Sequence, residues 1–211
     1  MKSFHVVAVL LVALFATSRA THAQSEQLRD TWQHVDDLFA AAGVRAGARV
    51  ADIGAGDGYL TVRLAQAVGS TGKVYAVDVD AKVADTLRAR LASAHLTNVD
   101  VIVGTDDDPR LAADAIDGAI ILNAYHEMPN GLSVLRHLFA ALRPGGRLVV
   151  CEPTPRTSGQ SRAAQVDQHV IDPVLVIDDL RAAGFDIVAR KDAFATNLGG
   201  TNFGFIAAQR P

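Results

Sequence analysis

The sequence "RVADIGAGDGYL" at residues 49–60 decides the fold. A short apolar run ends in three glycines, Gly54, Gly56 and Gly58, and an amphipathic stretch follows them. Glycines at the end of a strand allow a ligand to approach the backbone closely. A helix that begins directly after them points its free N–H groups and the positive end of its dipole at that ligand. The stretch therefore predicts a strand, a ligand-binding turn and a helix that begins near Tyr59.

The same alternation of strand and helix continues along the chain. Short runs rich in β-branched residues recur at 73–79, 99–104, 116–124 and 146–152. Helical patterns lie between the runs, at 59–68, 81–96 and 131–142. Near-continuously apolar strands that alternate with helices are typical of a parallel sheet covered on both faces. We therefore expect one doubly wound α/β domain.

The two ends of this domain differ from its middle. A helix is expected from Ser25, because Leu28, Trp32, Val35 and Phe39 fall at helical spacing before Gly43. Near the C-terminus, a helix at about 172–183 precedes two strand-like runs at 185–193 and 203–209. The gap between these runs is too short for a helical crossover, so we expect them to pair antiparallel as a hairpin.

Composition excludes some classes of partner. The chain has 211 residues, 49% of them hydrophobic, and a formal net charge of −3. Lysine and arginine do not cluster along any segment, so a nucleic-acid partner held by phosphate contacts is not expected. The single cysteine, Cys151, cannot form an intramolecular disulfide, and we interpret it as a small core residue.

Residues 1–23 have the features of a secretory signal peptide. Lys2 lies near the start, the run from 6 to 16 is apolar and uncharged, and small residues follow. We expect cleavage after Ala23 or Ala20, which would leave residues 24–211 as a single exported, periplasmic domain. The apolar run is too short to span a bilayer comfortably, so no stable membrane insertion is expected after cleavage. The alternative is a buried N-terminal helix, and a leader that is not used would keep the protein in the cytoplasm.

The spacing of the glycines narrows the choice of ligand. Dinucleotide folds use G-x-G-x-x-G, but Tyr59 stands where the third glycine would fall. A phosphate-binding loop is also excluded, since no lysine follows Gly58. Asp52, two residues before the first glycine, disfavours a polyphosphate and suits a ligand with an ammonium or sulfonium group. Asp78, at the end of the second strand, is placed to accept ribose hydroxyls, which dinucleotide enzymes also require.

Six blocks of the sequence then resemble a known family. They are "VADIGAGDGYLTVRLA", "VYAVDVD", "NVDVIVGTDDDPRL", "IDGAIILNAYHEM", "LRPGGRLVVCEP" and "AAGFDIV". In their order and spacing they resemble class I S-adenosylmethionine-dependent methyltransferases, over about residues 30–209. The resemblance is strongest to bacterial predicted methyltransferases, some of which carry a signal peptide. It implies a Rossmann-like, seven-stranded, mostly parallel sheet with strand order 3-2-1-4-5-7-6 and an antiparallel C-terminal hairpin strand.

The resemblance also implies a set of residues that bind S-adenosyl-L-methionine. The methionine part would be held by Asp52, Gly54, Ala55, Gly56 and Gly58. The ribose would be bound by Asp78, the adenine amino group by Asp106, and the region near the sulfonium by Asn123. Asp107 and Asp108 follow Asp106, and the acidic triplet also fits a solvated loop that caps a short helix.

The segment "AYHEM" at 124–128 supplies candidate catalytic residues, because it follows the fourth strand next to the expected methyl group. We expect His126 to act as the general base, since an imidazole titrates near neutral pH, and Tyr125 to orient the substrate. His169 is a further candidate from the opposite side of the pocket, and Glu127 could pair with either histidine. No metal is expected, because the spacing of these residues and His137 follows no known ligand rule.

The leading hypothesis is a methyltransferase that acts on a small-molecule or lipid-like acceptor. The alternatives are a catalytically silent protein that binds S-adenosylmethionine or a nucleoside, and an NAD-dependent oxidoreductase, which Tyr59 and the C-terminal hairpin disfavour. Substrate choice is expected to reside in the helix at 25–41 and the loop at 153–170.

Overall fold

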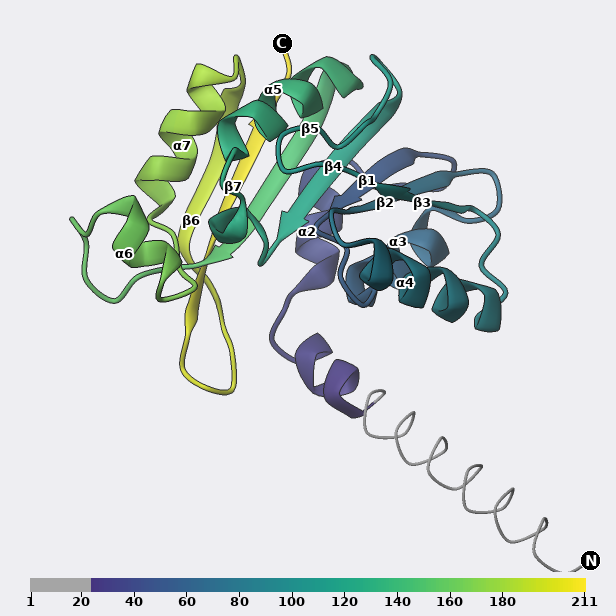
Figure 1. Ribbon diagram of the computed structural model, residues 1–211, viewed down its shortest axis with the longest axis horizontal. Helices are drawn as coiled ribbons and strands as arrows, with labels where there is room; N and C mark the ends of the chain where they lie inside the picture. The colour runs from purple at the N-terminus through teal and green to yellow at the C-terminus, as the bar shows by residue number, and fades with distance from the viewer. Residues whose placement is uncertain (1–23) are drawn as a thin grey trace, which may run out of the picture.

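A computed structural model describes residues 24–211 and places seven strands in one sheet of order β3-β2-β1-β4-β5-β7-β6 (Figure 1). The strands are β1 (Arg49–Ile53), β2 (Lys73–Asp78), β3 (Val99–Val103), β4 (Ile116–Leu122), β5 (Leu142–Pro153), β6 (Asp186–Thr196) and β7 (Asn202–Gln209). The helices are α2 (Val35–Ala42), α3 (Tyr59–Val68), α4 (Ala81–Ser93), η1 (Tyr125–Glu127, one 3-10 turn), α5 (Gly131–Ala141), α6 (Arg162–Val166) and α7 (Pro173–Ala182). The proposed signal peptide lies outside the described residues.

The sheet confirms the expected topology. Strands β1 to β5 pair parallel, and β7 pairs antiparallel with both β5 and β6. The chain passes from β1 outward through β2 to β3 and then returns to place β4 on the other side of β1. Ligands of open α/β sheets bind at such a reversal of strand order, beyond the carboxyl ends of the strands. The carboxyl ends of β1 and β4 therefore mark the site.

Helices cover both faces of the sheet (Figure 1). Apolar side chains of α2 and α3, including Leu38 and Leu64, pack on one face, and α4 packs beside them through Leu87. Those of α5 and α7, including Leu138 and Leu180, pack on the other face. All five of these side chains lie in helices with apolar residues at helical spacing, which explains why the sequence pattern located these helices.

The expected N-terminal helix is wrong as a single element. Residues 24–30 are helical, a turn follows at 31–33, and α2 begins only after His34, whose φ is 49°. The hydroxyl of Thr31 donates to the carbonyl oxygen of Leu28 (2.7 Å), which offers that carbonyl a partner other than the next turn of helix. The break separates a short helical segment (residues 24–30) from α2.

Three other elements differ in extent from the expectation. Strand β5 begins at Leu142, earlier than the run at 146–152, with an irregularity in its pairing to β4. Strand β6 extends to Thr196, and the short helix α6 lies within a segment expected to be a loop. Within residues 24–211, none of the helices combines the length and apolarity needed to cross a membrane.

Candidate cofactor and acceptor site

The three glycines after β1 have two different roles. All three have positive φ angles, of 74°, 54° and 86° for Gly54, Gly56 and Gly58. A Cβ atom on Gly54 would lie 2.5 Å from that of Ala124, and one on Gly58 would lie 2.3 Å from Cδ1 of Leu87. A Cβ atom on Gly56 would meet nothing within 4 Å. Gly54 and Gly58 therefore permit close internal packing, whereas Gly56 leaves open space for a ligand.

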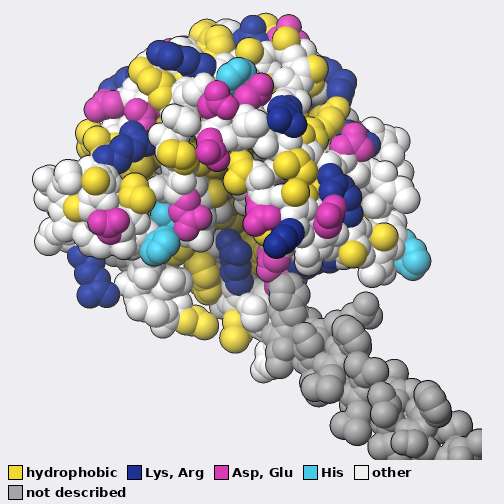
Figure 2. Space-filling view, in the orientation of Figure 1, with side chains coloured by type: hydrophobic (Ala, Val, Ile, Leu, Met, Phe, Trp, Pro, Cys, Tyr) yellow, Lys and Arg dark blue, Asp and Glu magenta, His cyan; other side chains and the backbone are white. Residues whose placement is uncertain are grey.

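Two cavities border this turn, and a third lies beyond Asn123. The central cavity has a volume of about 330 Å³ and is bordered by Gly54, Gly56, Asp78, Asp106 and Glu127, among others. The side cavity, of about 170 Å³, is bordered by Arg29, Asp52, Ala55 and Tyr59. The outer cavity, of about 710 Å³, lies between the loop after β5 and the β6–β7 hairpin. Figure 2 shows that this face is hollowed between acidic side chains, with a histidine side chain on one rim.

Asn123 borders all three cavities. It directly follows β4, and its backbone N–H donates to the carbonyl oxygen of Cys151 (2.9 Å). Its φ angle of 56° is unusual for a residue other than glycine. Such backbone conformations cost free energy and cluster at functional sites. Asn123 is therefore the point at which ligands in the separate cavities would meet.

The carboxylate of Asp78 borders the central cavity and is held in position by two backbone N–H groups. One oxygen accepts the N–H of Gly56 (2.9 Å) and the other accepts the N–H of Asp80 (3.0 Å). A carboxylate oxygen has a second lone pair, so two acceptor positions remain for ligand hydroxyls. The glycine turn and the end of β2 are thus tied together at the place where a ribose would bind.

Asp106 is the member of the acidic triplet that borders the central cavity. Asp107 instead accepts the hydroxyl of Thr105 (2.7 Å), and Asp108 accepts the N–H of Arg110 (2.7 Å). The two later residues shape the loop, which leaves Asp106 to face a ligand.

Asp52 is a buried carboxyl group at the side cavity. Burial raises its pKa to about 6, although the hydroxyl of Thr61 donates to it at 2.5 Å and the nearby Arg29 guanidinium favours its ionised form. A cationic ligand group in this cavity would compensate for the cost of the buried charge.

Arg29 is a site residue that the sequence did not reveal. Its guanidinium carbon lies 4.0 Å from the centre of the Tyr59 ring, and that of Arg63 lies at the same distance. Arg29 comes from the helical segment 24–30, which was expected to select the acceptor. No spacing rule connects it to the glycine turn, so only the packing of this segment places it beside Asp52.

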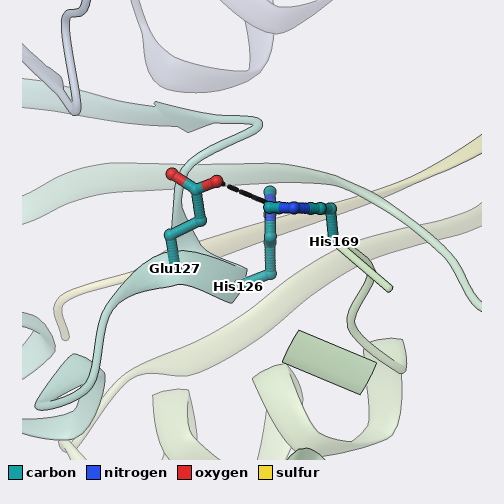
Figure 3. A group of neighbouring side chains, drawn as sticks. All are labelled: His126, Glu127 and His169. Carbon is teal, nitrogen blue, oxygen red and sulfur yellow. Dashed lines mark hydrogen bonds and ion pairs between the residues drawn. The ribbon is translucent and has the colours of Figure 1, made fainter. Parts of the chain in front are cut away.

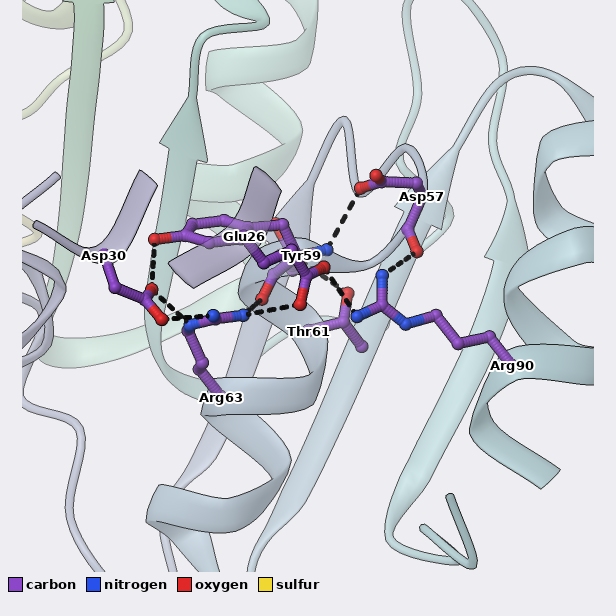
Figure 4. A network of polar contacts seen from close by, with 8 residues as sticks. Glu26, Asp30, Asp57, Tyr59, Thr61, Arg63 and Arg90 are labelled. Carbon is purple, nitrogen blue, oxygen red and sulfur yellow. Dashed lines mark hydrogen bonds and ion pairs between the residues drawn. The ribbon is translucent and has the colours of Figure 1, made fainter. Parts of the chain in front are cut away.

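A network of polar contacts holds the segment 24–30 against the turn (Figure 4). The Tyr59 hydroxyl and the Arg63 guanidinium both donate to Asp30, at distances from 2.7 to 2.8 Å. Arg90 bridges to Glu26 (2.6 Å) and to the carbonyl oxygen of Asp57 (2.7 Å). These contacts join α3 and α4 to the segment and so fix the position of Arg29.

Glu152, at the end of β5, organises the 3-10 turn η1. One carboxylate oxygen accepts the N–H groups of Ala124 and Tyr125, both at 2.8 Å. The other oxygen lies 2.6 Å from Nδ1 of His126. Glu152 and the His126 side chain are almost completely buried. The sequence showed Glu152 only as the end of a strand run, so its role was missed.

Neither His126 nor Tyr125 borders any of the three cavities. His126 borders none of the three, and burial alone would lower its pKa, but the hydrogen bond and charge of Glu152 outweigh burial and raise it. The Tyr125 ring is buried, and its hydroxyl donates to Asp179 (2.8 Å), which also accepts from Arg162 (2.7 Å). The expectation that Tyr125 orients a substrate is not supported by this position, because the hydroxyl is occupied in the core.

The structure brings His126 together with Glu127 and His169. The Glu127 carboxylate lies 3.1 Å from Nδ1 of His169 and 3.7 Å from Nε2 of His126. The two imidazole rings meet edge to face, with their centres 5.7 Å apart. Glu127 borders the central cavity and His169 the outer one. His137 is half exposed on α5 and contacts the backbone of its own helix.

The outer cavity is lined mainly by polar groups. The loop after β5 contributes Thr154, Arg156, Gln168 and His169, as expected for the segment 153–170. The β6–β7 hairpin contributes Asn197, Thr201 and Asn202, which the sequence did not indicate. The N-terminal segment contributes to the side cavity instead.

Comparison with known proteins adds a match to a family model over part of the chain. Residues 50–146 match the family model described as a methyltransferase domain. The ubiquinone/menaquinone biosynthesis C-methyltransferase UbiE of Hahella chejuensis is 32% identical over 112 residues, 53% of this chain and 45% of that protein. The chain spans about half the length of the curated relatives it matches.

Two solved structures show how far the fold extends. A SAM-dependent methyltransferase from Aquifex aeolicus has a TM-score of 0.70 at 22% identity and covers 84% of this chain and 90% of that one. The [4+2]-cyclase SpnF has a TM-score of 0.74 at 17% identity and covers 85% of this chain and 81% of that one. At these identities the likeness is one of fold. Residues 50–146 thus match a methyltransferase domain, and most of the chain shares the fold of the S-adenosylmethionine-dependent methyltransferase from Aquifex aeolicus.

Proposed function

We propose that this protein transfers a methyl group from S-adenosylmethionine to a small polar acceptor. The observation that carries the proposal is the position of Asn123, which borders the central, side and outer cavities at once. A cofactor that fills the first two cavities would place its sulfonium at Asn123, and an acceptor in the outer cavity would meet the methyl group there.

The residues around the first two cavities fit the cofactor group by group. In the side cavity, the Asp52 carboxylate suits an α-ammonium group and the Arg29 guanidinium suits an α-carboxylate. In the central cavity, Asp78 has acceptor positions for ribose hydroxyls, and Asp106 can accept from an adenine amino group. The open space at Gly56 lies between these groups.

S-adenosylmethionine supplies a methyl group on a sulfonium: attack by the acceptor forms the new bond while the methyl–sulfur bond breaks and its electron pair stays on sulfur. The protein's part is to hold both reactants in line. An acceptor that carries a proton must also lose it. We assign this task to the group formed by His126, Glu127 and His169, in which His169 borders the outer cavity and His126 lies behind it.

The polar lining of the outer cavity favours a small polar acceptor over one with a long apolar chain. Arg156, Gln168, Asn197 and Asn202 offer hydrogen-bonding groups to a ligand, and a buried apolar tail would leave them unpaired. The curated relative UbiE is named for quinone biosynthesis, so a small hydroxylated ring is a suitable first compound for assays.

Calorimetry with S-adenosylmethionine, S-adenosylhomocysteine and NAD tests the cofactor. We expect binding of the first two and none of NAD, and the reverse result would refute the proposal. Incubation with radiolabelled S-adenosylmethionine and cell extract then tests transfer, with an Asp78→Asn variant as control. Binding without any labelled product would identify a silent binding protein instead.

His126→Ala tests the route of the proton. The variant is expected to lose most of its turnover and to keep its affinity for S-adenosylmethionine, because His126 borders none of the cavities. A variant with full turnover would exclude this residue from proton transfer.

We also propose that the protein is exported through the signal sequence at 1–23. The support is the order of a basic start, an apolar run and small residues. Fractionation of cells followed by sequencing of the mature N-terminus tests this, and a retained Met1 would contradict it.

A further inference from the structure

We infer that His126, Glu127 and His169 form a binding site for a divalent transition metal ion of the zinc class. The site would lie between the central and outer cavities, where it would contact the methyl acceptor. This inference deepens the proposed function, on which its catalytic role rests, but metal binding itself is tested separately below.

Two of the three separations between the ligand atoms already suit such an ion. Glu127 Oε1 lies 3.1 Å from His169 Nδ1 and 3.7 Å from His126 Nε2, and ligand atoms from all three residues lie within 4.8 Å of one another. Tetrahedral zinc with bonds of about 2.0–2.2 Å holds its ligand atoms about 3.3 Å apart. Two of the separations are already close to this value. The third would have to shorten, and the His169 side chain that would move is 73% exposed. The three side chains point toward one another in Figure 3.

The ligand set matches a catalytic metal centre. Two imidazoles and one carboxylate occupy three positions of a tetrahedral zinc ion, and the fourth remains for water or substrate. Imidazole nitrogen favours zinc and its transition-metal neighbours over magnesium or calcium, which prefer oxygen ligands alone.

Glu152 supplies an independent observation that points to a metal. Its carboxylate lies 2.6 Å from Nδ1 of His126, and both side chains are buried. Histidines that bind metals usually donate their second ring N–H to a carboxylate, which fixes the tautomer and directs the other nitrogen at the ion. Here that other nitrogen is Nε2, which lies 3.7 Å from the Glu127 carboxylate. His126 itself lines neither the central nor the outer cavity.

The chain reaches this arrangement through a distant segment. His169 follows α6, and its backbone N–H donates to the carbonyl oxygen of Val166 (2.9 Å) with a φ of 53°. A left-handed conformation at a residue other than glycine costs free energy. The turn it creates carries the His169 ring to the edge of the His126 ring, 5.7 Å between centres.

A metal ion here would act on the acceptor. His169 borders the outer cavity and Glu127 the central one, so the fourth position lies on the path between acceptor and cofactor. A hydroxyl or thiol bound to the ion would lose its proton to solvent at neutral pH and attack the methyl group as the oxyanion or thiolate, while the methyl–sulfur bond breaks and its electron pair stays on sulfur. His126, Glu127 and His169 would then promote loss of the proton as ligands of the ion and not as a base, and the acceptor class would be hydroxylated or thiol compounds.

Titration of the full chain with ZnCl2 tests the site. The protein is prepared without a polyhistidine tag, treated with a chelator, and titrated by calorimetry, with visible absorption of added CoCl2 as a second readout. We expect one equivalent of Zn²⁺ to bind and Co²⁺ to show the intense visible bands of a tetrahedral site.

Matched variants locate the ion. His169→Asn is expected to weaken binding at least tenfold, while His95→Asn should leave it unchanged; both histidines are exposed and have φ near 55°. Glu152→Gln should weaken binding by about 10- to 100-fold. Absence of Zn²⁺ binding, or equal binding by the wild type and His169→Asn, would overturn the inference.

The same samples separate the two proposals. Zn²⁺ binding with no affinity for S-adenosylmethionine would refute the proposed function and leave the metal site in place. Binding of S-adenosylmethionine with no Zn²⁺ binding would refute the metal site and leave the proposed function in place.

Discussion

The central cavity is lined by residues that directly follow strands, whereas the outer cavity is lined by long loops. Gly54, Asp78 and Asn123 lie within one residue of the ends of β1, β2 and β4. The outer cavity combines the loop after β5 with the tip of the β6–β7 hairpin, segments about 40 residues apart in the chain. A cofactor shared by a whole family can be bound by short local motifs. An acceptor that differs between proteins is bound where loops can vary without disturbing the sheet.

The largest expected effect is on the free energy of unfolding, and it compares one glycine from each region. Gly54→Ala places a Cβ atom 2.5 Å from that of Ala124 at a φ of 74°, whereas Gly200→Ala, in the hairpin at a φ of 78°, meets nothing within 4 Å. We expect Gly54→Ala to lower the free energy of unfolding by about 3 kcal/mol and Gly200→Ala by about 1 kcal/mol. Urea unfolding measures both. Equal losses would show that the turn after β1 is not packed as closely as the structure indicates.

The next effect concerns the ribose site. Asp78→Asn removes a charged acceptor for the cofactor hydroxyls, so we expect affinity for S-adenosylmethionine to fall about 10- to 100-fold. Asp107→Asn is the matched control, since Asp107 accepts the Thr105 hydroxyl and borders none of the three cavities. Calorimetry distinguishes the variants. If both lose affinity alike, the effect is one of net charge and Asp78 does not contact the cofactor.

A third prediction concerns pH. Asp52 has a pKa of about 6, and only its carboxylate form attracts the ammonium of the cofactor. Affinity for S-adenosylmethionine should therefore be full above pH 7 and fall about tenfold as pH drops from 7 to 5, a range in which an α-amino group stays protonated. Titrations at each pH measure this. The Asp52→Asn variant should bind weakly with little pH dependence, and an unchanged pH profile in that variant would assign the effect to another group.

The smallest expected effect belongs to the outer region alone. The Asn197 side chain accepts the N–H groups of Gly199 and Thr201, both at 2.9 Å, and so holds the hairpin tip. Asn197→Ala should lower the free energy of unfolding by about 1 kcal/mol and leave affinity for S-adenosylmethionine unchanged. Asn130→Ala is the control, because Asn130 makes no capping hydrogen bond at α5. A loss of cofactor affinity in Asn197→Ala would contradict the separation of the two regions.

The sequence alone predicted the sheet order, and it named several residues that border the central and side cavities, but not Arg29. It could do so because alternation of apolar strands and helices is local, and because Asp52, Gly56 and Asp78 occupy fixed positions after strands. The sequence did not indicate that Gly58 packs against Leu87 or that Tyr125 bonds to Asp179. Both contacts join residues that lie far apart in the chain, so no motif or spacing in the sequence predicts them.

The tertiary structure alone decided which residues from distant segments meet. Arg29 reaches Asp52 because the segment 24–30 is held on α3 and α4 by ion pairs. Glu152 reaches His126 from β5, and His169 reaches Glu127 from a loop 42 residues further along the chain. Ligand spacing in the sequence matched no known rule and so predicted no metal, while side-chain positions in space bring two histidines and a carboxylate together. Contacts of this kind depend on how loops close over the sheet, and no periodicity in the sequence records that closure.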